Sequence, residues 1–104
     1  MAFSLLREPT KSFKMEIEAI RQLVLQNKFD TALEMLNDQI SASPSDVIAL
    51  QLRGHIFYKM QRWGDAMNDF TSVLEIEPDN AEAKSKLELA QNILGYFTPD
   101  MFNP

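Results

Sequence analysis

Apolar residues along this chain recur mainly every three or four positions, which is the spacing of one face of an α-helix. Between residues 29 and 40, for example, they fall at Phe29, Ala32, Leu33, Leu36 and Ile40. This helical spacing, rather than the alternation typical of strands, predicts five amphipathic helices over residues 13–26, 29–40, 47–60, 63–76 and 81–94.

The expected helix ends carry residues that interrupt or cap helices. Pro44 and Pro78 follow the second and fourth stretches, and a helix rarely continues through the residue before a proline. The run from Asp79 to Glu82 has the pattern of a capping box for the fifth helix. Gly95 suits a left-handed residue at the C-terminal end of that helix. Connections this short make consecutive helices antiparallel neighbours.

A fixed offset of 34 residues relates the second predicted helix to the fourth. The paired positions are Phe29 and Trp63, Ala32 and Ala66, Leu36 and Phe70, Ile40 and Leu74, and Pro44 and Pro78. Aligned without gaps, residues 13–46 and 47–80 are identical only at the alanine and proline pairs. A constant period in this range indicates a repeat protein.

The second unit resembles the tetratricopeptide repeat, whose pattern is Trp-x2-Leu-Gly-x2-Tyr, then Ala-x3-Phe, then Pro. The matching positions carry Leu50, Arg53, Gly54, Phe57, Ala66, Phe70 and Pro78. Arg53 stands where leucine is usual, and Ile20 stands in the first unit where glycine is expected. The resemblance implies an all-α fold, a right-handed superhelix of antiparallel helical hairpins (a TPR-like α-solenoid) with about two repeats plus a closing helix.

The same reading divides the chain into three parts. We expect an N-terminal extension over residues 1–12, a repeat domain over 13–95 and an apolar C-terminal tail over 96–104. Within the domain, the repeats cover 13–46 and 47–80, and the closing helix covers 81–95.

Composition narrows the function. The 104 residues carry a net charge of −5 and no cysteine, which argues against nucleic acid as a partner and excludes thiolate chemistry. No apolar stretch approaches the roughly 20 residues that span a bilayer, so we expect a cytoplasmic protein that does not enter membranes. No cofactor is expected.

Groove positions carried over from the family predict where a protein or peptide partner would bind. They are Lys14, Ile17, Arg21, Val24 and Leu25 in the first unit, Ile48, Gln51, His55, Tyr58 and Lys59 in the second, and Glu82, Ser85, Leu89, Asn92 and Ile93 in the closing helix. This set is locally basic and partly apolar, which fits a peptide with an apolar side chain and a carboxylate. The alternative interpretation is that these residues only solvate one face.

The sequence can be compared with the residues that bind one known ligand of the family, the C-terminal tail of a chaperone. By the resemblance, a clamp for chaperone C-terminal tails needs Lys and Asn in the first unit, Asn in the second, and Lys and Arg in the third. The matching positions carry Ile17, Arg21, Leu52, Glu82 and Lys86. Of the residues that the clamp needs, only the last cation has a counterpart of the same charge here, Lys86. This argues against a chaperone C-terminal tail as the ligand.

Catalysis finds little support in the sequence. His55 is the sole histidine and has no further ligands at metal spacing around it. Asp65 and Asp69 lie one helical turn apart, and we interpret them as surface charges rather than as an acid pair. We therefore expect a non-catalytic interaction module or scaffold.

The C-terminal tail leaves three interpretations open. Its apolar residues are Tyr96, Phe97, Met101 and Phe102. The tail packs back on the last helix, docks on a second subunit or partner, or is disordered. A self-assembling homodimer, built from exposed helix ends and this tail, is the alternative function, because two and a half repeats are close to the minimum for a stable array.

Overall fold

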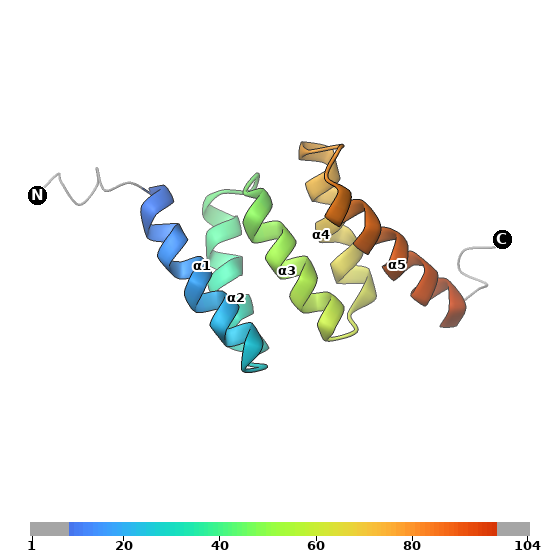
Figure 1. Cartoon of the computed structure of the whole chain (residues 1–104), viewed down its shortest axis with the longest axis horizontal. Helices are drawn as coiled ribbons and strands as arrows, with labels where there is room; N and C mark the ends of the chain where they lie inside the picture. Colours follow the sequence, from blue (N-terminus) through green and yellow to red (C-terminus); the bar gives the residue numbers. More distant parts are fainter. Residues whose placement is uncertain (1–8, 98–104) are drawn as a thin grey trace, which may run out of the picture. The chain divides into compact units, whose positions relative to one another are not determined.

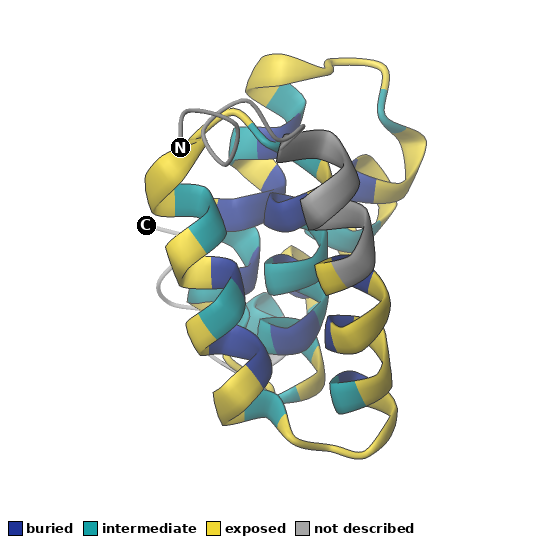
Figure 2. Ribbon diagram, turned by 90° about the vertical axis from the view of Figure 1, so that its left-hand side faces the viewer, coloured by how far each residue is buried: buried dark blue, intermediate teal, exposed yellow. Residues whose placement is uncertain are grey.

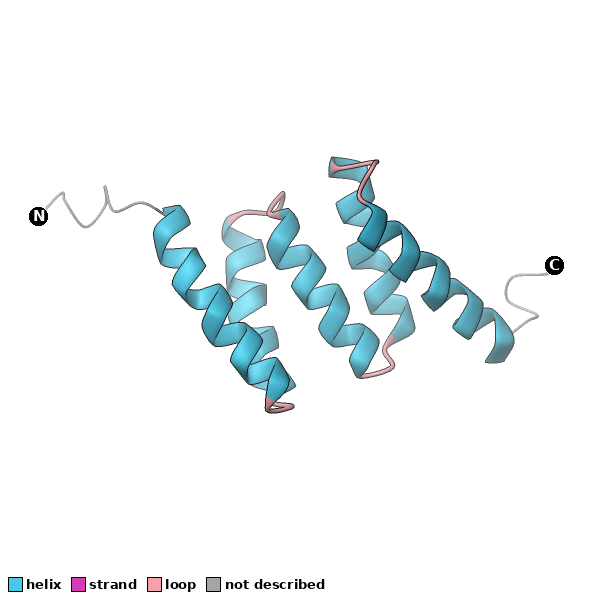
Figure 3. Cartoon of the chain, in the orientation of Figure 1, coloured by secondary structure: helices cyan, strands magenta, loops and turns pink. Residues whose placement is uncertain are grey.

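The computed structural model describes the backbone of residues 9–97 and the side chains of residues 16–95. That part is entirely helical, with short turns between helices (Figures 1 and 3). The helices are α1 (Pro9–Leu25), α2 (Phe29–Ala42), α3 (Val47–Lys59), α4 (Trp63–Ile76) and α5 (Ala81–Phe97). The predicted all-α class of sequential antiparallel helices is confirmed.

Five helix ends differ from the sequence prediction, by one to four residues. The first helix begins at Pro9 instead of residue 13, which is physically reasonable because proline fits the first helical position, where no backbone N–H is needed. The prediction that Gly95 ends the last helix in a left-handed conformation is wrong. Gly95 lies inside α5, and no glycine in the described part has a positive φ.

The chain forms two compact units, which are described separately. The first unit, Met1–Met35, contains α1 and the first half of α2. Its buried apolar residues follow the spacing of a helix face, as the dark blue positions in Figure 2 illustrate. They are Ile17, Ile20, Val24, Ala32 and Leu33.

The second unit, Leu36–Pro104, is built around α4. Helix α4 packs against both α3 and α5 and lies behind them in Figure 1. Its core cluster is drawn from all three helices and consists of Leu50, Ala66, Phe70, Val73 and Ala83. Burying such apolar surface is the main force that holds a small helical unit together.

Gly54 explains how closely α3 and α4 approach. A Cβ atom built at Gly54 would lie 3.0 Å from two ring atoms of Phe70 and 3.2 Å from the Cβ of Asp69. These distances are tighter than most real Cβ contacts, so the side chains of Phe70 and Asp69 would have to give way by a few tenths of an ångström. The small residue that the repeat pattern places at this position therefore suits the close approach of the two helices.

The turns after α1 and α3 share one backbone structure at an offset of 34 residues. Asn27 and Gln61 both adopt a left-handed conformation, with φ of 60° and 62°. In each turn, this residue donates to the carbonyl three positions earlier, at 3.0 Å. The next residue donates to the carbonyl five positions earlier, at 2.8 Å. This paired arrangement is the Schellman motif, which satisfies carbonyls at a helix C-terminus.

The starts of α3 and α5 also match at that offset. The Asp46 side chain accepts a hydrogen bond from the Ala49 backbone N–H at 3.1 Å. The Asn80 side chain accepts one from the Ala83 N–H at 2.9 Å. Asn80, and not Asp79, therefore caps α5, and the predicted capping box is wrong by one residue. Asparagine and aspartate serve equally well as N-caps.

Candidate partner-binding site

The candidate residues of the first unit fall into different environments. Ile17 and Val24 are each 8% exposed and belong to the buried face of α1. Arg21 is exposed, and the side chain of Lys14 lies outside the described residues. Of these four positions, Arg21 is the one whose described side chain is accessible to a partner.

The second unit brings its candidates together between α3 and α5. Gln51 donates to a carboxylate oxygen of Glu82 at 3.2 Å and accepts from the Asn80 amide at 3.2 Å. One turn further along, the Nζ of Lys86 lies 3.5 Å from the Nδ1 of His55. The same Nζ lies 5.0 Å from the centre of the Tyr58 ring. Side chains of α3 and α5 thus contact each other directly.

We call this surface the α3–α5 face. Its residues are Gln51, His55, Tyr58 and Lys59 on α3, and Glu82, Lys86 and Leu89 on α5. Its cross-helix contacts join residues 31 positions apart, Gln51 to Glu82 and His55 to Lys86. The same offset places Leu89 level with Tyr58.

Lys86 is the member that the groove prediction omitted. Glu82, Lys86 and Leu89 follow the spacing i, i+4, i+7, which places them on one stripe of α5. The sequence therefore contains a signal for Lys86: it lies on the same stripe of α5 as the groove position Leu89, and His55 is a predicted groove position on α3.

Two ammonium groups of this face, on Lys59 and Lys86, have no ion-pair partner in the described part of the chain. The ion pairs formed there are Arg53 with Asp69 and Arg62 with Asp65. Among the described side chains, no carboxylate lies within ion-pair distance of Lys59 or Lys86. The chain as a whole has fifteen acidic residues against ten basic ones, so this local excess of cations stands out from the charge of the chain.

The pKa of His55 is lowered from its ordinary value of 6.5. Burial of the ring is the largest cause, followed by the positive charges of Lys86 and Lys59, while Glu82 acts in the opposite direction. The imidazole is therefore neutral at pH 7, and its Nδ1 can accept a hydrogen bond from the Lys86 ammonium, which can only donate.

Apolar surface lies at both ends of this face. Ile48 is 50% exposed at the start of α3, and Leu89 is 48% exposed on α5. The Tyr58 ring is held edge-on by Trp63, with ring centres 5.0 Å apart. An exposed Leu89, a fixed aromatic ring and unpaired ammonium groups are suited to bind a ligand that is both apolar and anionic.

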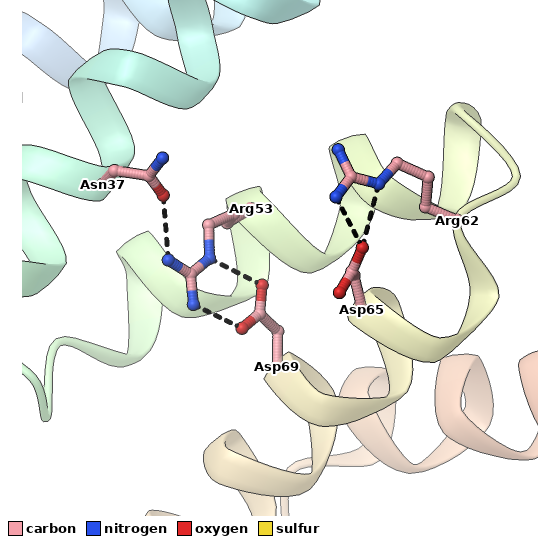
Figure 4. Close-up of polar contacts among 5 residues, drawn as sticks. All are labelled: Asn37, Arg53, Arg62, Asp65 and Asp69. Atoms are coloured by element: carbon pink, nitrogen blue, oxygen red, sulfur yellow. Dashed lines mark hydrogen bonds and ion pairs between the residues drawn. The ribbon is translucent and has the colours of Figure 1, made fainter.

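The interpretation of Asp69 as a surface charge is wrong. Asp69 is 3% exposed and accepts two hydrogen bonds from Arg53, whose third contact is with the side-chain oxygen of Asn37 at 2.9 Å (Figure 4). Asp65 pairs separately with Arg62 at 2.7 Å. The two aspartates therefore have structural partners and do not form an acid pair.

Metal chemistry is not indicated where side chains are described. Over residues 16–95, no group of three histidine, aspartate or glutamate side chains is placed to hold a metal ion. In the part of the chain covered by the structure, no helix has the length and apolar character needed to cross a bilayer.

Comparison with known proteins defines the class. No family model matches the chain. It is 32% identical over 75 residues to DnaJ homolog subfamily C member 7 homolog of Schizosaccharomyces pombe. It is 29% identical over 87 residues to Superkiller protein 3 of Saccharomyces cerevisiae, and 40% identical over 60 residues to RNA polymerase II-associated protein 3 of Rattus norvegicus.

These matches cover 66%, 83% and 58% of the chain, but only 16%, 6% and 9% of the respective relatives. The chain therefore spans a small fraction of each of these proteins. All three contain tetratricopeptide repeats.

Antiparallel helices with turns and caps repeated at a 34-residue offset define a helical-hairpin repeat protein. These distant relatives, which contain tetratricopeptide repeats, support a more specific class, a tetratricopeptide-repeat protein. Domains of this family are protein–protein interaction modules and are typically not catalytic.

Proposed function

We propose that this protein is a non-catalytic interaction module that holds a peptide or helix of a partner protein on the α3–α5 face. The observation that carries the proposal is the pair of ammonium groups, on Lys59 and Lys86, that lack a carboxylate partner among the described side chains. A ligand carboxylate would supply the charged hydrogen-bond partner that these two ammonium groups lack.

The chemistry of the face favours one class of ligand. Lys86 is positioned from two sides, by the imidazole of His55 and the ring of Tyr58, so little side-chain entropy is lost when an anion binds it. Leu89 lies along the same stripe of α5 and is half-exposed. The ligand we propose is a peptide segment with a carboxylate next to an apolar side chain.

The proposal is tested by selecting binders from a random-peptide display library on the full chain. Selected peptides are expected to share an acidic residue beside an apolar one. Affinities of synthetic copies are then measured by calorimetry against Lys59→Glu and Lys86→Glu variants, each expected to bind at least about tenfold more weakly, because an attractive charge becomes repulsive.

Lys84→Glu is the matched control. Lys84 lies on α5, two residues from Lys86, and is exposed. Its substitution makes the same charge change at a position outside the stripe of Glu82, Lys86 and Leu89. Peptide affinity should therefore stay within about twofold of that of the unaltered chain. Arg21→Glu reports whether the first unit contributes to the same ligand. Peptides that bind Lys59→Glu, Lys86→Glu and Lys84→Glu equally well would overturn the proposal.

A further inference from the structure

The chain beyond α5 contains the chemistry that the α3–α5 face is suited to bind. Asp100, Met101 and Phe102 follow one another, so a carboxylate lies next to two apolar side chains. These residues lie outside the described part of the chain. The question is whether the length of the chain brings them to it.

The sequence after α5 disfavours continuation of the helix. Helix α5 ends at Phe97, and Thr98 is followed by Pro99. The residue before a proline is biased away from the helical conformation, and proline itself cannot continue the backbone hydrogen bonding. Both effects favour a turn that would let the following residues run back along α5.

A segment that returns along α5 would reach the face. Helix residues rise about 1.5 Å each, so Leu89 lies about 12 Å back from Phe97. Extended residues advance about 3.4 Å each, so five of them reach about 17 Å. Phe102 can therefore return to the level of Leu89 with chain left for the turn.

The same arithmetic brings Asp100 towards Lys59. Lys59 is level with Ala90 if the 31-residue offset of the cross-helix contacts continues to the end of α3. Ala90 lies about 10 Å back from Phe97 along α5, and three extended residues cover about 10 Å, so the Asp100 and Lys59 side chains must span the turn and the crossing from α5 to α3. A lysine side chain adds several ångströms of reach.

We propose that residues 100–102 fold back on the α3–α5 face of their own chain, with Asp100 paired to Lys59 and Phe102 packed on Leu89. The inference rests on the proposed function, because the tail acts as a resident ligand that competes with an external peptide. A tether this short supplies an effective concentration on the order of millimolar, so weak contacts suffice to occupy the face.

The first test is nuclear magnetic resonance of the full chain. Nuclear Overhauser contacts are expected between the Phe102 ring and the Leu89 methyl groups. A mixture of labelled and unlabelled chains, recorded with isotope filtering, assigns these contacts to one molecule. Contacts found only between molecules would overturn the proposal in favour of exchange with a second copy.

The second test uses a capped synthetic peptide of residues 98–104 as the probe. It should bind the full chain carrying Asp100→Asn and Phe102→Ala at least about threefold more tightly than the unaltered chain, because the tail no longer competes. Adding Lys59→Glu should remove that gain, and adding Lys84→Glu should keep it. Asp79→Asn is the control for the loss of one negative charge, because Asp79 is an exposed aspartate in the turn before α5.

The outcomes separate this inference from the proposed function. Equal probe affinity for the unaltered and tail-altered chains, or no binding to either, overturns the tail inference. If library-selected peptides still depend on Lys59 and Lys86, the proposed function stands without it. If they do not depend on these lysines, the proposed function fails, whatever the tail does.

Discussion

The guanidinium of Arg53 donates two hydrogen bonds to the carboxylate of Asp69, from Nε to Oδ2 at 2.8 Å and from Nη2 to Oδ1 at 2.7 Å. Asp69 is almost fully buried, while the Arg53 side chain remains 23% exposed. Hydrogen bonding to Asp69 is also the main reason that the pKa of Arg53 is raised. Arg53, which stands where the family usually has leucine, is thus paired with an acidic residue, Asp69, on the helix that faces it.

Arg53→Leu, which restores the usual family residue, is expected to destabilise this protein by about 3 kcal/mol. It would leave the Asp69 carboxylate buried without its cation, and removing one partner of a buried ion pair is more costly than removing both. Urea unfolding followed by circular dichroism measures the change.

The double variant Arg53→Leu, Asp69→Leu supplies the control, since it removes the charge that would be left unpaired. It should recover most of the lost stability, because apolar replacements of a buried pair are often neutral. A double variant as unstable as the single one would mean that the pair itself contributes, beyond avoiding an unpaired charge.

Two glycines offer opposite outcomes for one substitution. Gly54→Ala should destabilise by about 1–3 kcal/mol, because the new methyl group meets the Phe70 ring at 3.0 Å. Gly64→Ala should stabilise by about 0.5 kcal/mol, because no atom lies within 4 Å of its added Cβ and alanine favours helices. Thermal unfolding of both variants tests this, and equal effects at the two sites would contradict the packing described for Gly54.

Gln61 occupies a backbone conformation that suits glycine better. Its φ is 62°, a region where a non-glycine residue is strained by about 1 kcal/mol. Gln61→Gly should therefore stabilise by about 0.5 kcal/mol after allowing for the greater freedom of the unfolded chain. Gln61→Val should instead destabilise, and a lower melting temperature for Gln61→Gly than for the unaltered chain would show that the turn is not strained.

His55 should make stability depend on pH. Because its folded pKa lies below 6.5, the unfolded chain binds more protons as pH falls through 6.5, and stability falls with it. The loss continues down to the folded pKa, below which both states are protonated. The groups that set the effect are Lys86, Lys59 and Glu82.

His55→Gln should flatten this part of the curve when melting temperatures are compared between about pH 7.5 and pH 5.5. Lys86→Met should raise the His55 pKa partway toward 6.5 in a proton resonance titration, since burial remains the larger cause. The protein has one histidine, so the titrating signal has a single source. An unchanged pKa in Lys86→Met would show that the two side chains do not interact.

The helices were predictable because both their faces and their ends are encoded locally. Spacing of apolar residues and the prolines at 44 and 78 gave five helices close to those observed. The cap at Asn80 was missed in favour of Asp79, because both residues are good caps and only backbone geometry distinguishes them.

The side-chain partners were less predictable because they depend on contacts between distant positions. Asp69 looks exposed in the sequence because it is charged, and only the facing Arg53, sixteen positions earlier, makes its burial possible. Ile17 and Val24 were chosen as groove residues by family position, and the structure shows that both are buried. The contact of Lys86 with His55, 31 positions earlier, likewise depends on the pairing of α3 with α5.

The equivalent caps at Asp46 and Asn80 have a consequence for how such a chain can lengthen. Residues 47–80 begin after one cap and end at another, with Ala49 and Ala83 donating in the same way. If a copy of residues 47–80 were inserted after Asn80, Asn80 would precede its first helix as Asp46 precedes α3, and would cap it in the same way. Growth by one whole hairpin thus requires no new linker, because the cap hydrogen bond at the join is formed by residues already present on both sides.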